Sequence, residues 1–506
     1  MKVLFLNPPF MANFSRESRS PAVAKSRTLY YPKWLAHAAG VAIKEGHEVD
    51  FIDAPAAPFD TKYVIDRMRS KNIEAVVVET STPSIINDIE VVEEIHAALP
   101  NVHMMMVGRH VSALPNETFE QTPSLKVIAL REYDYTVRDW LAALESGASL
   151  DSVAGLMWKN DRGELIKNEK RPVIENLDEL PFVSEVYKRF LHVPDYFYGH
   201  SYWPIVTFDT SRGCPYRCTF CHYPQTFSGH RMRYRSVENV ADEFDYIRRE
   251  LPDVKNIMFE DDTFIIDVDR TERLADELIK RNNPIPYTSN VRANVNADVR
   301  FFKKLRKSGA RMFCVGIESG DDEVLKHMKK GLNLDKTHDF MKNCRDSGIM
   351  VHGCFMVGNL NETKETMQKT LDLALQLRPD TAQFYPIMVY PGTAAYEEAK
   401  VKGYLSTEDY SQWLTSDGLH NSVVNLPNIS HRELVEFCDH ARIKFYLNPR
   451  YIAFKAWQSL KDPRELVRNV MGFQKLVKYL IMGSFSADDK ANKESEVGTK
   501  TATAGG

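Results

Sequence analysis

Residues 204–221 read PIVTFDTSRGCPYRCTFC, a short β-branched and aromatic run followed directly by a loop that carries three cysteines. The first six residues have the composition of a buried strand. Cys214, Cys218 and Cys221 then fall within eight residues. The whole chain has seven cysteines, and an odd, sparse set in a long chain is not a disulfide framework. The clustering therefore predicts a metal site on a loop at the carboxyl end of a strand.

This strand opens a run of six strand candidates, and helical patterns follow the first five of them. The strands are expected at 204–209, 255–260, 286–291, 310–318, 349–357 and 381–390. The helices are expected at 237–250, 270–280, 297–307, 323–329 or 334–346, and 364–377. Six β/α units within 201–400 predict a partial (β/α)6 TIM-type barrel with its site at the carboxyl ends of the strands. The periodicity by itself also allows a second open sheet.

The first 145 residues alternate strand and helix in the same way. Strands are expected at 2–6, 47–53, 75–80, 103–107 and 125–130, and helices at 32–45, 61–71, 87–97 and 137–145. This pattern predicts a doubly wound, Rossmann-like α/β domain, which binds ligands at the carboxyl ends of its parallel strands. No Gly-x-Gly-x-x-Gly follows the first strand, which disfavours nicotinamide or flavin binding through a dinucleotide fingerprint.

The remaining segments complete an α/β chain. Residues 146–200 are expected to be a linker with a β-hairpin at 155–159 and 164–168. Residues 401–484 are expected to be a helical region, with helices at 434–447, 452–460 and 466–480. Residues 485–506 are polar and almost free of apolar side chains, which predicts a disordered tail.

Composition restricts the class of protein. The 506 residues include 43% hydrophobic and 26% charged residues, which is typical of globular domains. The formal net charge of −4 gives no overall basic field for a nucleic acid. No apolar run is long enough to span a bilayer, and the start of the chain reads as a strand rather than a signal peptide. We therefore expect a cytoplasmic protein without a transmembrane segment or a nucleic-acid partner.

Two kinds of metal site compete for the three cysteines. Three thiolates on one tight loop can each hold one iron of a cubane, and the fourth iron then remains open to a substrate. The rival is a structural zinc site with three Cys and one His. His222 is the nearest histidine, but as a direct neighbour of Cys221 it is poorly placed to close a tetrahedron. Three unrelated thiols are the simplest alternative, which the spacing disfavours.

The Cys-x-x-x-Cys-x-x-Cys segment at the start of a β/α domain resembles the signature of the radical S-adenosylmethionine (SAM) superfamily. Further similarity extends across residues 200–400. The resemblance implies a [4Fe-4S] cluster on Cys214, Cys218 and Cys221, whose open iron chelates SAM. One electron from the cluster then yields a 5′-deoxyadenosyl radical. It also implies an electron donor such as flavodoxin or ferredoxin.

The same resemblance suggests cofactor contacts on the other barrel loops. An aromatic residue before the third cysteine packs on the adenine, an Arg suits the methionine carboxylate, and the Gly316–Gly320 stretch contacts the ribose or amino group. Core packing, helix capping, a solvated Arg and a tight turn are the competing structural explanations. The cofactor candidates are Phe220, Glu260, Asn290, Arg292, Glu318 and Ser319, and the acid/base candidates on late strands are His352 and Tyr385.

The amino-terminal domain resembles the cobalamin-binding domain of one radical SAM subfamily. The loop residues that carry this resemblance are Asn7, Pro8, Thr80, Ser81, Gly108, Arg109 and His110. The Asp-x-His-x-x-Gly loop of many other cobalamin proteins is absent. Its partial match around His37 lies in an expected helix, so cobalt would lack a lower His ligand. Residues 131–134 read REYD where the subfamily often has a Gly-Glu-Gly-Glu-like turn.

Three functions remain open at this stage. The first is a cobalamin-dependent radical methylase acting on an unactivated carbon of a small molecule, lipid or pigment. The second is an oxidative cyclase or ring-rearranging enzyme with the same cofactors. The third makes the amino-terminal domain a non-catalytic docking or sensory module. Aromatic residues interleaved with Lys and Arg in the last helices suggest either a lipid or membrane surface or, more simply, a cap packed on the barrel.

Overall fold

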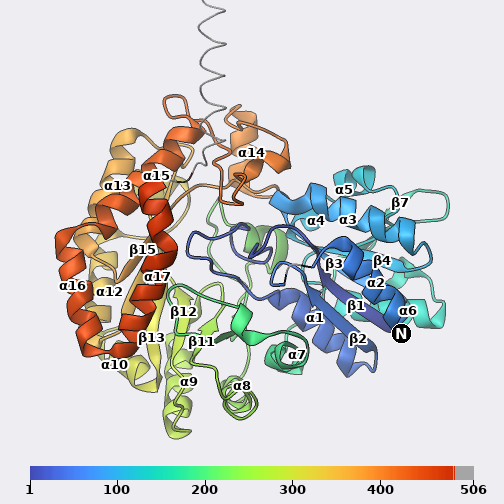
Figure 1. Cartoon of the computed structure of the whole chain (residues 1–506), viewed down its shortest axis with the longest axis horizontal. Coiled ribbons are helices and arrows are strands. Elements are labelled where there is room, and N and C mark those ends of the chain that lie inside the picture. The colour runs from blue at the N-terminus through green and yellow to red at the C-terminus, as the bar shows by residue number, and fades with distance from the viewer. Residues whose placement is uncertain (58, 483, 485–506) are drawn as a thin grey trace, which may run out of the picture.

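The computed structural model describes residues 1–57, 59–482 and 484. The expected tail at 485–506 lies outside the described residues. Figure 1 shows two α/β bodies side by side, with the long C-terminal helices (orange to red) against the second body.

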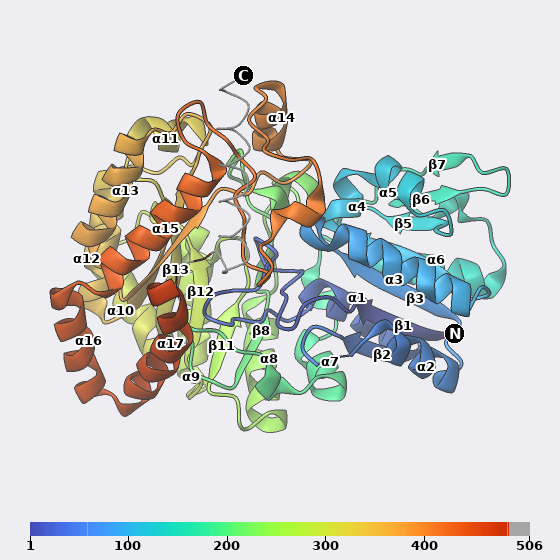
Figure 2. The ribbon, with the colours of Figure 1, turned by 45° about the horizontal axis from the view of Figure 1, so that its top comes forward.

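The amino-terminal body is built on a seven-stranded sheet with the order β2-β1-β3-β4-β5-β6-β7. Its parallel part consists of β1 (Lys2–Asn7), β2 (Glu48–Asp53), β3 (Ala75–Thr80), β4 (His103–Gly108) and β5 (Val127–Ala129). One face carries α1 (Lys33–Lys44) and α6 (Asp134–Ser146), and the other carries α2 (Thr61–Lys71) and α3 (Ile85–Ala98). The predicted doubly wound domain is therefore confirmed, and Figure 2 shows its helices flanking the sheet.

The hairpin expected in the linker belongs to this sheet. β6 (Leu156–Lys159) pairs antiparallel with β5, and β7 (Leu165–Lys167) pairs antiparallel with β6. Leu156 and Met157 point to opposite faces of β6 and are both buried in the sheet, whereas an isolated hairpin would leave them in water. Of the expected linker, only the part beyond β7 crosses to the second body, through α7 (Val183–Phe190).

The second body is the predicted partial barrel. Its six parallel strands pair in the order β15-β14-β13-β12-β11-β8. Each strand therefore lies beside the barrel strand that comes before or after it along the chain. The strands are β8 (Ile205–Phe208), β11 (Asn256–Phe259), β12 (Tyr287–Val291), β13 (Ala310–Glu318), β14 (Met350–Val357) and β15 (Thr381–Pro386). The helices that return between them are α8 (Val237–Glu250), α9 (Val268–Lys280), α10 (Val299–Ser308), α11 (Asp322–His327), α12 (Leu334–Ser347) and α13 (Lys364–Leu377).

The C-terminal region is helical only in part. Residues 404–430 form turns, isolated bridges and the 3₁₀ turn η7 (Tyr410–Trp413), so the expectation of a helical region from 401 was wrong for this segment. Gly418 has φ +75°, and a proline follows at 427; both interrupt a helix. The helices are α14 (Ala394–Val401), α15 (His431–Tyr446), α16 (Pro449–Lys461) and α17 (Pro463–Met482).

Residues 8–31 cross between the two bodies without regular structure and continue into α1. The two bodies also share one apolar core. Tyr31 stacks on Tyr196 with ring centroids 3.7 Å apart, and its hydroxyl donates to the carbonyl of Ile205 on β8 (2.8 Å). Within the described part of the chain, no helix is long and apolar enough to cross a membrane.

Candidate active site

The cysteine loop leaves the carboxyl end of β8 and returns to it. β9 (Ser211–Arg212) pairs antiparallel with β10 (Arg233–Tyr234), so residues 213–232 form a closed excursion. Gly213 has φ +94°, and a Cβ at this position would lie 2.1 Å from the carbonyl oxygen of Arg231. Only glycine fits there, and it sets the direction in which the chain enters Cys214.

Two polar side chains hold this loop in shape. The Gln225 amide donates to the carbonyls of Cys218, Thr219 and Cys221 at 3.2, 3.1 and 2.8 Å. Its oxygen accepts from the backbone N–H of Ala394, at the start of α14 (3.0 Å). The three-cysteine turn is thus tied to the end of the barrel.

The second polar side chain is that of Asp261, which follows β11 and holds the start of the loop at Thr210 and Ser211. Its carboxylate accepts from the Thr210 backbone N–H (2.7 Å) and from the hydroxyls of Thr210 and Ser211 (both 2.6 Å). Because the carboxylate is buried, these bonds satisfy a group that would otherwise be costly to place there. The loop is therefore rigid at both ends.

The three thiols suit a cluster better than a single ion. Burial raises the pKa of the Cys214 thiol to about 11 and that of the Cys221 thiol to about 12. Within the residues that the structure describes, no three His, Cys, Asp or Glu side chains lie close enough together to hold one metal ion. A zinc site needs its ligands on one ion, whereas each thiolate of a three-cysteine cubane holds a different iron. The arrangement thus disfavours the zinc alternative.

The third strand contributes the basic side of the site. Arg292 lies just after β12, is buried, and its guanidinium lies 3.5 Å from the sulfur of Cys218. It stacks 3.7 Å above the ring centroid of Tyr216 and also donates to the Lys330 carbonyl. Its Nε has no hydrogen-bond partner in the structure, which leaves a buried donor available for a carboxylate.

The predicted residues Glu260 and Asn290 meet although they come from different strands. The Glu260 carboxylate accepts from the Tyr198 hydroxyl (3.0 Å) and lies 3.4 Å from the Asn290 amide nitrogen. Burial raises the pKa of Glu260. Asn290 lines the large cavity described below, whereas Glu260 lines a small void beside it.

The fourth strand ends at Glu318, which is the centre of a triad with Lys330 and Tyr385. Glu318 has a left-handed φ of +67°, at the point where the pairing of β13 and β14 shifts by one residue. Its carboxylate accepts from Lys330 Nζ (2.7 Å) and from the Tyr385 hydroxyl (2.9 Å). Burial and the neighbouring Glu318 raise the pKa of Tyr385, so the phenol stays protonated and donates. Ser319 does not line the cavity described below; its hydroxyl lies 3.3 Å from the Thr370 hydroxyl on α13.

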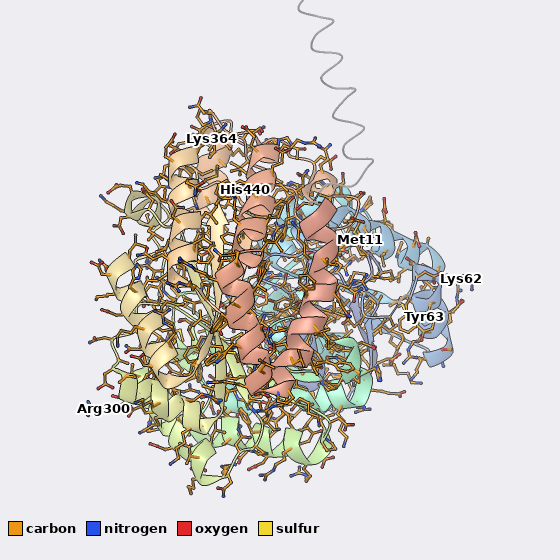
Figure 3. The ribbon with its side chains drawn as sticks, turned by 60° about the vertical axis from the view of Figure 1, so that its left-hand side comes forward. Met11, Lys62, Tyr63, Arg300, Lys364 and His440 are labelled. Carbon is orange, nitrogen blue, oxygen red and sulfur yellow. The ribbon has the colours of Figure 1, made fainter. Side chains whose placement is uncertain are left out.

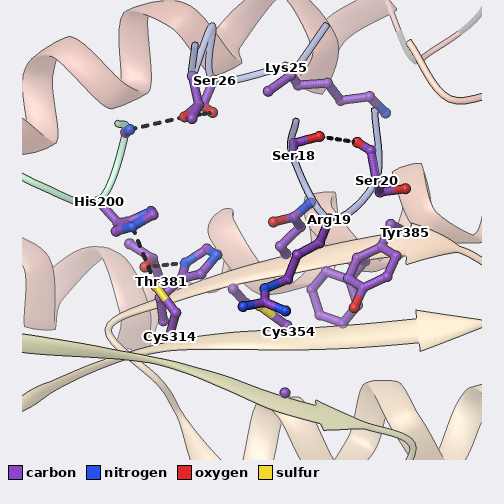
Figure 4. Close-up of a pocket in the computed structure, with 18 of the residues that line it drawn as sticks. Ser18, Arg19, Ser20, Lys25, Ser26, His200, Cys314, Cys354, Thr381 and Tyr385 are labelled. Carbon is purple, nitrogen blue, oxygen red and sulfur yellow. Dashed lines mark hydrogen bonds between the residues drawn. The ribbon is translucent and has the colours of Figure 1, made fainter. Parts of the chain in front are cut away.

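The amino-terminal segment adds a cation to the site. Arg19 donates to the Asp262 carboxylate (3.0 Å) and to the Asp261 carbonyl (2.7 Å). Burial opposes its charge, but the carboxylate of Asp262 and the nearby Cys221 outweigh this effect and raise the pKa of Arg19. Figure 4 shows its guanidinium reaching down between Cys354 and Tyr385.

One cavity of about 1240 Å³ connects these groups. Pockets for single drug-sized ligands measure about 300–1,000 Å³, so this volume is generous for SAM alone. Most of the predicted barrel residues line it, namely Cys214, Cys218, Cys221, Phe220, Asn290, Arg292, Glu318, His352 and Tyr385. The structure therefore brings together residues that are up to 171 positions apart, from Cys214 to Tyr385.

A histidine pair lies along the same cavity. His200 and His352 stack with ring centroids 5.1 Å apart, and His352 Nδ1 lies 2.8 Å from the Thr381 hydroxyl. His200 Nε2 lies 3.3 Å from the sulfur of Cys314. Burial lowers the pKa of His352 to about 4 and also lowers that of His200, so both rings are neutral near pH 7.

The seven predicted loop residues of the amino-terminal domain meet along one edge of its sheet. All seven are buried, and none lines the large cavity. Arg16 reaches into this edge and donates to the Asn7 side chain (3.0 Å), the Pro8 carbonyl (2.6 Å) and Asp88 (2.7 Å). The turn η7 contacts the neighbouring η1 (Thr82–Ser84). Arg16 and η7 thus cover part of this edge in the structure.

Several residues of the site were not predicted. Arg19, Lys330 and His200 lie in loops that only the fold brings to the cavity, and Tyr198, which bonds Glu260, lines the small void beside it. The Ser-Arg-Ser around Arg19 reads as an ordinary polar loop, so no sequence signal distinguishes it.

Two family models match the chain. The radical SAM superfamily model matches residues 209–374, and the B12 binding domain model matches residues 19–140. These ranges fall on the partial barrel and on the amino-terminal body.

Curated relatives cover most of the chain. An uncharacterized methyltransferase of Pyrococcus horikoshii is 29% identical over 89% of this chain and 94% of its own length. Cytidylyl-2-hydroxyethylphosphonate methyltransferase of Streptomyces wedmorensis is 25% identical over 79% and 83%. Anaerobic magnesium-protoporphyrin IX monomethyl ester cyclase of Cereibacter sphaeroides is 23% identical over 82% and 66%.

Solved structures share the fold. The radical SAM methyltransferase TsrM from Kitasatospora setae, with cobalamin and a [4Fe-4S] cluster bound, has a TM-score of 0.68 at 16% identity, over 94% of this chain and 99% of that chain. The cobalamin-dependent SAM radical enzyme OxsB, with aqua-cobalamin and SAM bound, has a TM-score of 0.68 at 17% identity, over 99% and 75%. The matched models and the shared fold confirm the predicted class: the chain combines an amino-terminal B12-binding domain with a radical SAM domain, the arrangement found in these cobalamin-dependent radical SAM enzymes.

Proposed function

We propose that this protein is a radical SAM methyltransferase that uses cobalamin to methylate an unactivated carbon. The observation that carries the proposal is the loop with Cys214, Cys218 and Cys221, which opens into a cavity that also contains Arg292 and the Glu318 triad. The B12-binding domain and the relatives named as methyltransferases support methylation over other radical reactions.

The protein's own residues would bind and orient SAM beside the cluster. Arg292 offers a buried, unpaired N–H beside Cys218, which suits the methionine carboxylate. Glu318 is a carboxylate held at fixed geometry by Lys330 and Tyr385, which suits the amino or ribose hydroxyl groups. Phe220 lines the cavity between two of the cysteines and offers an aromatic face to the adenine. When bound, the cluster would supply the electron that cleaves SAM, and cobalamin would carry the methyl group.

His352 and Tyr385 remain the proposed acid/base groups. Both line the cavity, and each is held in one protonation state near neutral pH, His352 as neutral imidazole and Tyr385 as phenol. A neutral imidazole can accept a proton from a substrate, whereas the phenol can donate one. The one-electron donor would be a small redox protein such as flavodoxin or ferredoxin.

An oxidative cyclase is the second candidate, because one curated relative is named as a cyclase. A methylase releases S-adenosylhomocysteine together with 5′-deoxyadenosine, and a cyclase releases only the latter. Product analysis with substrate present would therefore separate the two functions.

The first experiment measures metal and cofactor content after purification without oxygen. We expect about four irons and four sulfides per chain, as a cubane requires, and cobalamin bound to the wild-type protein. The Cys214→Ala, Cys218→Ala, Cys221→Ala triple variant should lose the iron and keep the cobalamin. Cys354→Ser is the matched control, since this thiol lines the same cavity outside the cysteine loop.

Each other result contradicts a defined part of the proposal. Iron without cobalamin would discard the methylase and favour a docking role for the amino-terminal domain. Zinc on the same three cysteines would overturn the radical chemistry altogether.

A further inference from the structure

The C-terminal helices α16 and α17 concentrate the exposed apolar surface of the described chain. Nine of its fourteen exposed large apolar side chains lie between residues 447 and 473. They are Leu447, Ile452, Phe454, Trp457, Leu460, Leu466, Val467, Val470 and Phe473. Figure 3 shows the face of the molecule on which the C-terminal helices lie side by side. Apolar surface gathered in this way on one pair of helices marks an interaction site rather than ordinary surface scatter.

Other side chains of this region form hydrogen bonds and ion pairs with the barrel. The Tyr451 hydroxyl of α16 donates to the Asp380 carbonyl (2.9 Å), and just before this helix the Tyr446 hydroxyl at the end of α15 donates to the Ala382 carbonyl (2.7 Å). In α17, Glu465 accepts from Arg311 at the start of β13 (3.0 Å). These helices therefore contact the barrel through one set of side chains, while the apolar side chains named above remain exposed.

The exposed apolar side chains also form the wall of the active-site cavity. Six of the nine line it, namely Leu447, Ile452, Leu460, Leu466, Val470 and Phe473. The same cavity contains Cys214, Cys218 and Cys221 at its other end. The cavity thus extends from the cysteine loop to apolar side chains of α16 and α17 that are also exposed, which marks an apolar opening at these helices.

The charge around this opening is positive although the whole chain is negative. Residues 447–474 contain five basic and two acidic residues, whereas the formal net charge of the chain is −4. Lys455 lines the cavity, and its ammonium donates to the neutral amide oxygen of Gln458 (2.5 Å). Lys461 lies 3.7 Å above the ring centroid of Trp457. Exposed apolar side chains interspersed with Lys and Arg along the same helices are suited to the interface of an anionic bilayer.

We infer that α16 and α17 dock on an anionic membrane surface and that the cavity receives an amphipathic lipid from that membrane as substrate. The inference rests on the proposed function and names its substrate class. The hydrocarbon part would enter between α16 and α17, and its reacting carbon would reach the end of the cavity at the cysteine loop. An opening that faces the bilayer lets such a substrate enter without exposing its chain to water.

Membrane docking is tested by flotation with vesicles. We expect the anaerobically purified wild-type protein to float with phosphatidylcholine–phosphatidylglycerol vesicles at a 7:3 ratio and far less with pure phosphatidylcholine. Leu460→Asp and Trp457→Asp should each lower the vesicle-bound fraction by about tenfold or more, because each places a charge in the interface. Val401→Asp on α14 is the matched control: Val401 and Leu460 are both 87% exposed, and Val401 lies away from the opening.

The outcomes that overturn docking are distinct. Absence of wild-type binding, or an equal loss in Val401→Asp, would overturn it. A wild-type dimer in lipid-free buffer that Leu460→Asp converts to a monomer would instead assign the surface to a second copy of the chain.

Entry of a lipid chain is tested with cis-parinaric acid, a fluorescent fatty acid. Saturable binding by the wild-type protein, weakened about tenfold or more by Ile452→Glu, is expected, and binding unchanged in that variant would contradict the route. Iron content and SAM cleavage are measured on the same samples. Loss of those signals would count against the proposed function, whereas loss of vesicle or fatty-acid binding alone would count against this inference.

Discussion

At the scale of single residues, the site depends on buried charges held by specific partners. Glu318 is placed by a left-handed backbone and fixed between Lys330 and Tyr385, while Arg292 is fixed between Cys218 and the Lys330 carbonyl. Each of these groups would cost free energy if it were buried alone. Their partners come from other loops, so the barrel arranges the charges before a ligand arrives.

Glu318→Gln should weaken SAM binding by about tenfold, because it replaces a charged acceptor with a neutral one. Equilibrium binding of SAM to the protein with its cluster reconstituted would measure this. Glu323→Gln, on the exposed side of α11, is the control and should bind SAM like the wild type. Equal affinity in all three proteins would exclude Glu318 from the SAM site.

His110 should make the amino-terminal body sensitive to acid. Burial lowers its folded-state pKa to about 3, below the unfolded value near 6.5. Below pH 6.5 the unfolded chain therefore binds a proton that the folded chain does not, so the stability is full above pH 6.5 and falls as the pH decreases. At pH 5 the loss is about 2 kcal/mol relative to a variant without this group.

Urea unfolding of wild type and His110→Asn at pH 7.5 and pH 5 tests this prediction. The free energy of unfolding should fall further in the wild type than in the variant. The same pH dependence in both proteins would show that His110 does not remain neutral in the folded state.

At the scale of elements, α17 is held to the barrel by a buried ion cluster. Glu465 accepts from Arg311 (3.0 Å) and from Arg468 (2.7 Å), and all three side chains are at most 5% exposed. Glu465→Gln leaves two buried guanidinium groups without their carboxylate, which costs about 3–5 kcal/mol. We expect faster tryptic cleavage near Arg464, followed by mass spectrometry. Glu397→Gln on exposed α14 should leave the cleavage rate unchanged.

At the scale of the whole molecule, the segment 8–31 lies between the barrel cavity and the sheet edge that carries the predicted cobalamin loops. Arg16 and Asp88 form an ion pair at 2.7 Å whose side chains are both 0% exposed. If cobalamin binds at this edge, amide hydrogen exchange within residues 9–31 should rise when it is added. Exchange in α8, on the far side of the barrel, should not change.

Asp88→Asn should raise exchange in the same segment without cobalamin, because Arg16 loses its carboxylate. Asp66→Asn, which disrupts an exposed pair with Lys62, is the matched control. Cobalamin binding with no change in residues 9–31 would place the cofactor elsewhere.

The sequence by itself determined the two α/β bodies and the cysteine loop. Strands such as 75–80 and 310–318, and helices such as 237–250 and 364–377, were predicted to the residue, because strong hydrophobic periodicity and capping residues are local signals. The three cysteines lie within eight residues, so their joint role was readable without a fold.

Only the tertiary structure decided which distant groups share the site. Arg19 reaches Asp262 across 243 residues, and Tyr385 reaches Glu318 across 67. The hairpin of β6 and β7 joined the first sheet because β5 offered an unpaired edge, and the turn η7 within residues 404–430 packs against η1 and α3 of the amino-terminal body. Such contacts depend on chain crossing and packing, which no local pattern encodes, so the cavity and its apolar opening emerged only when the chain was folded.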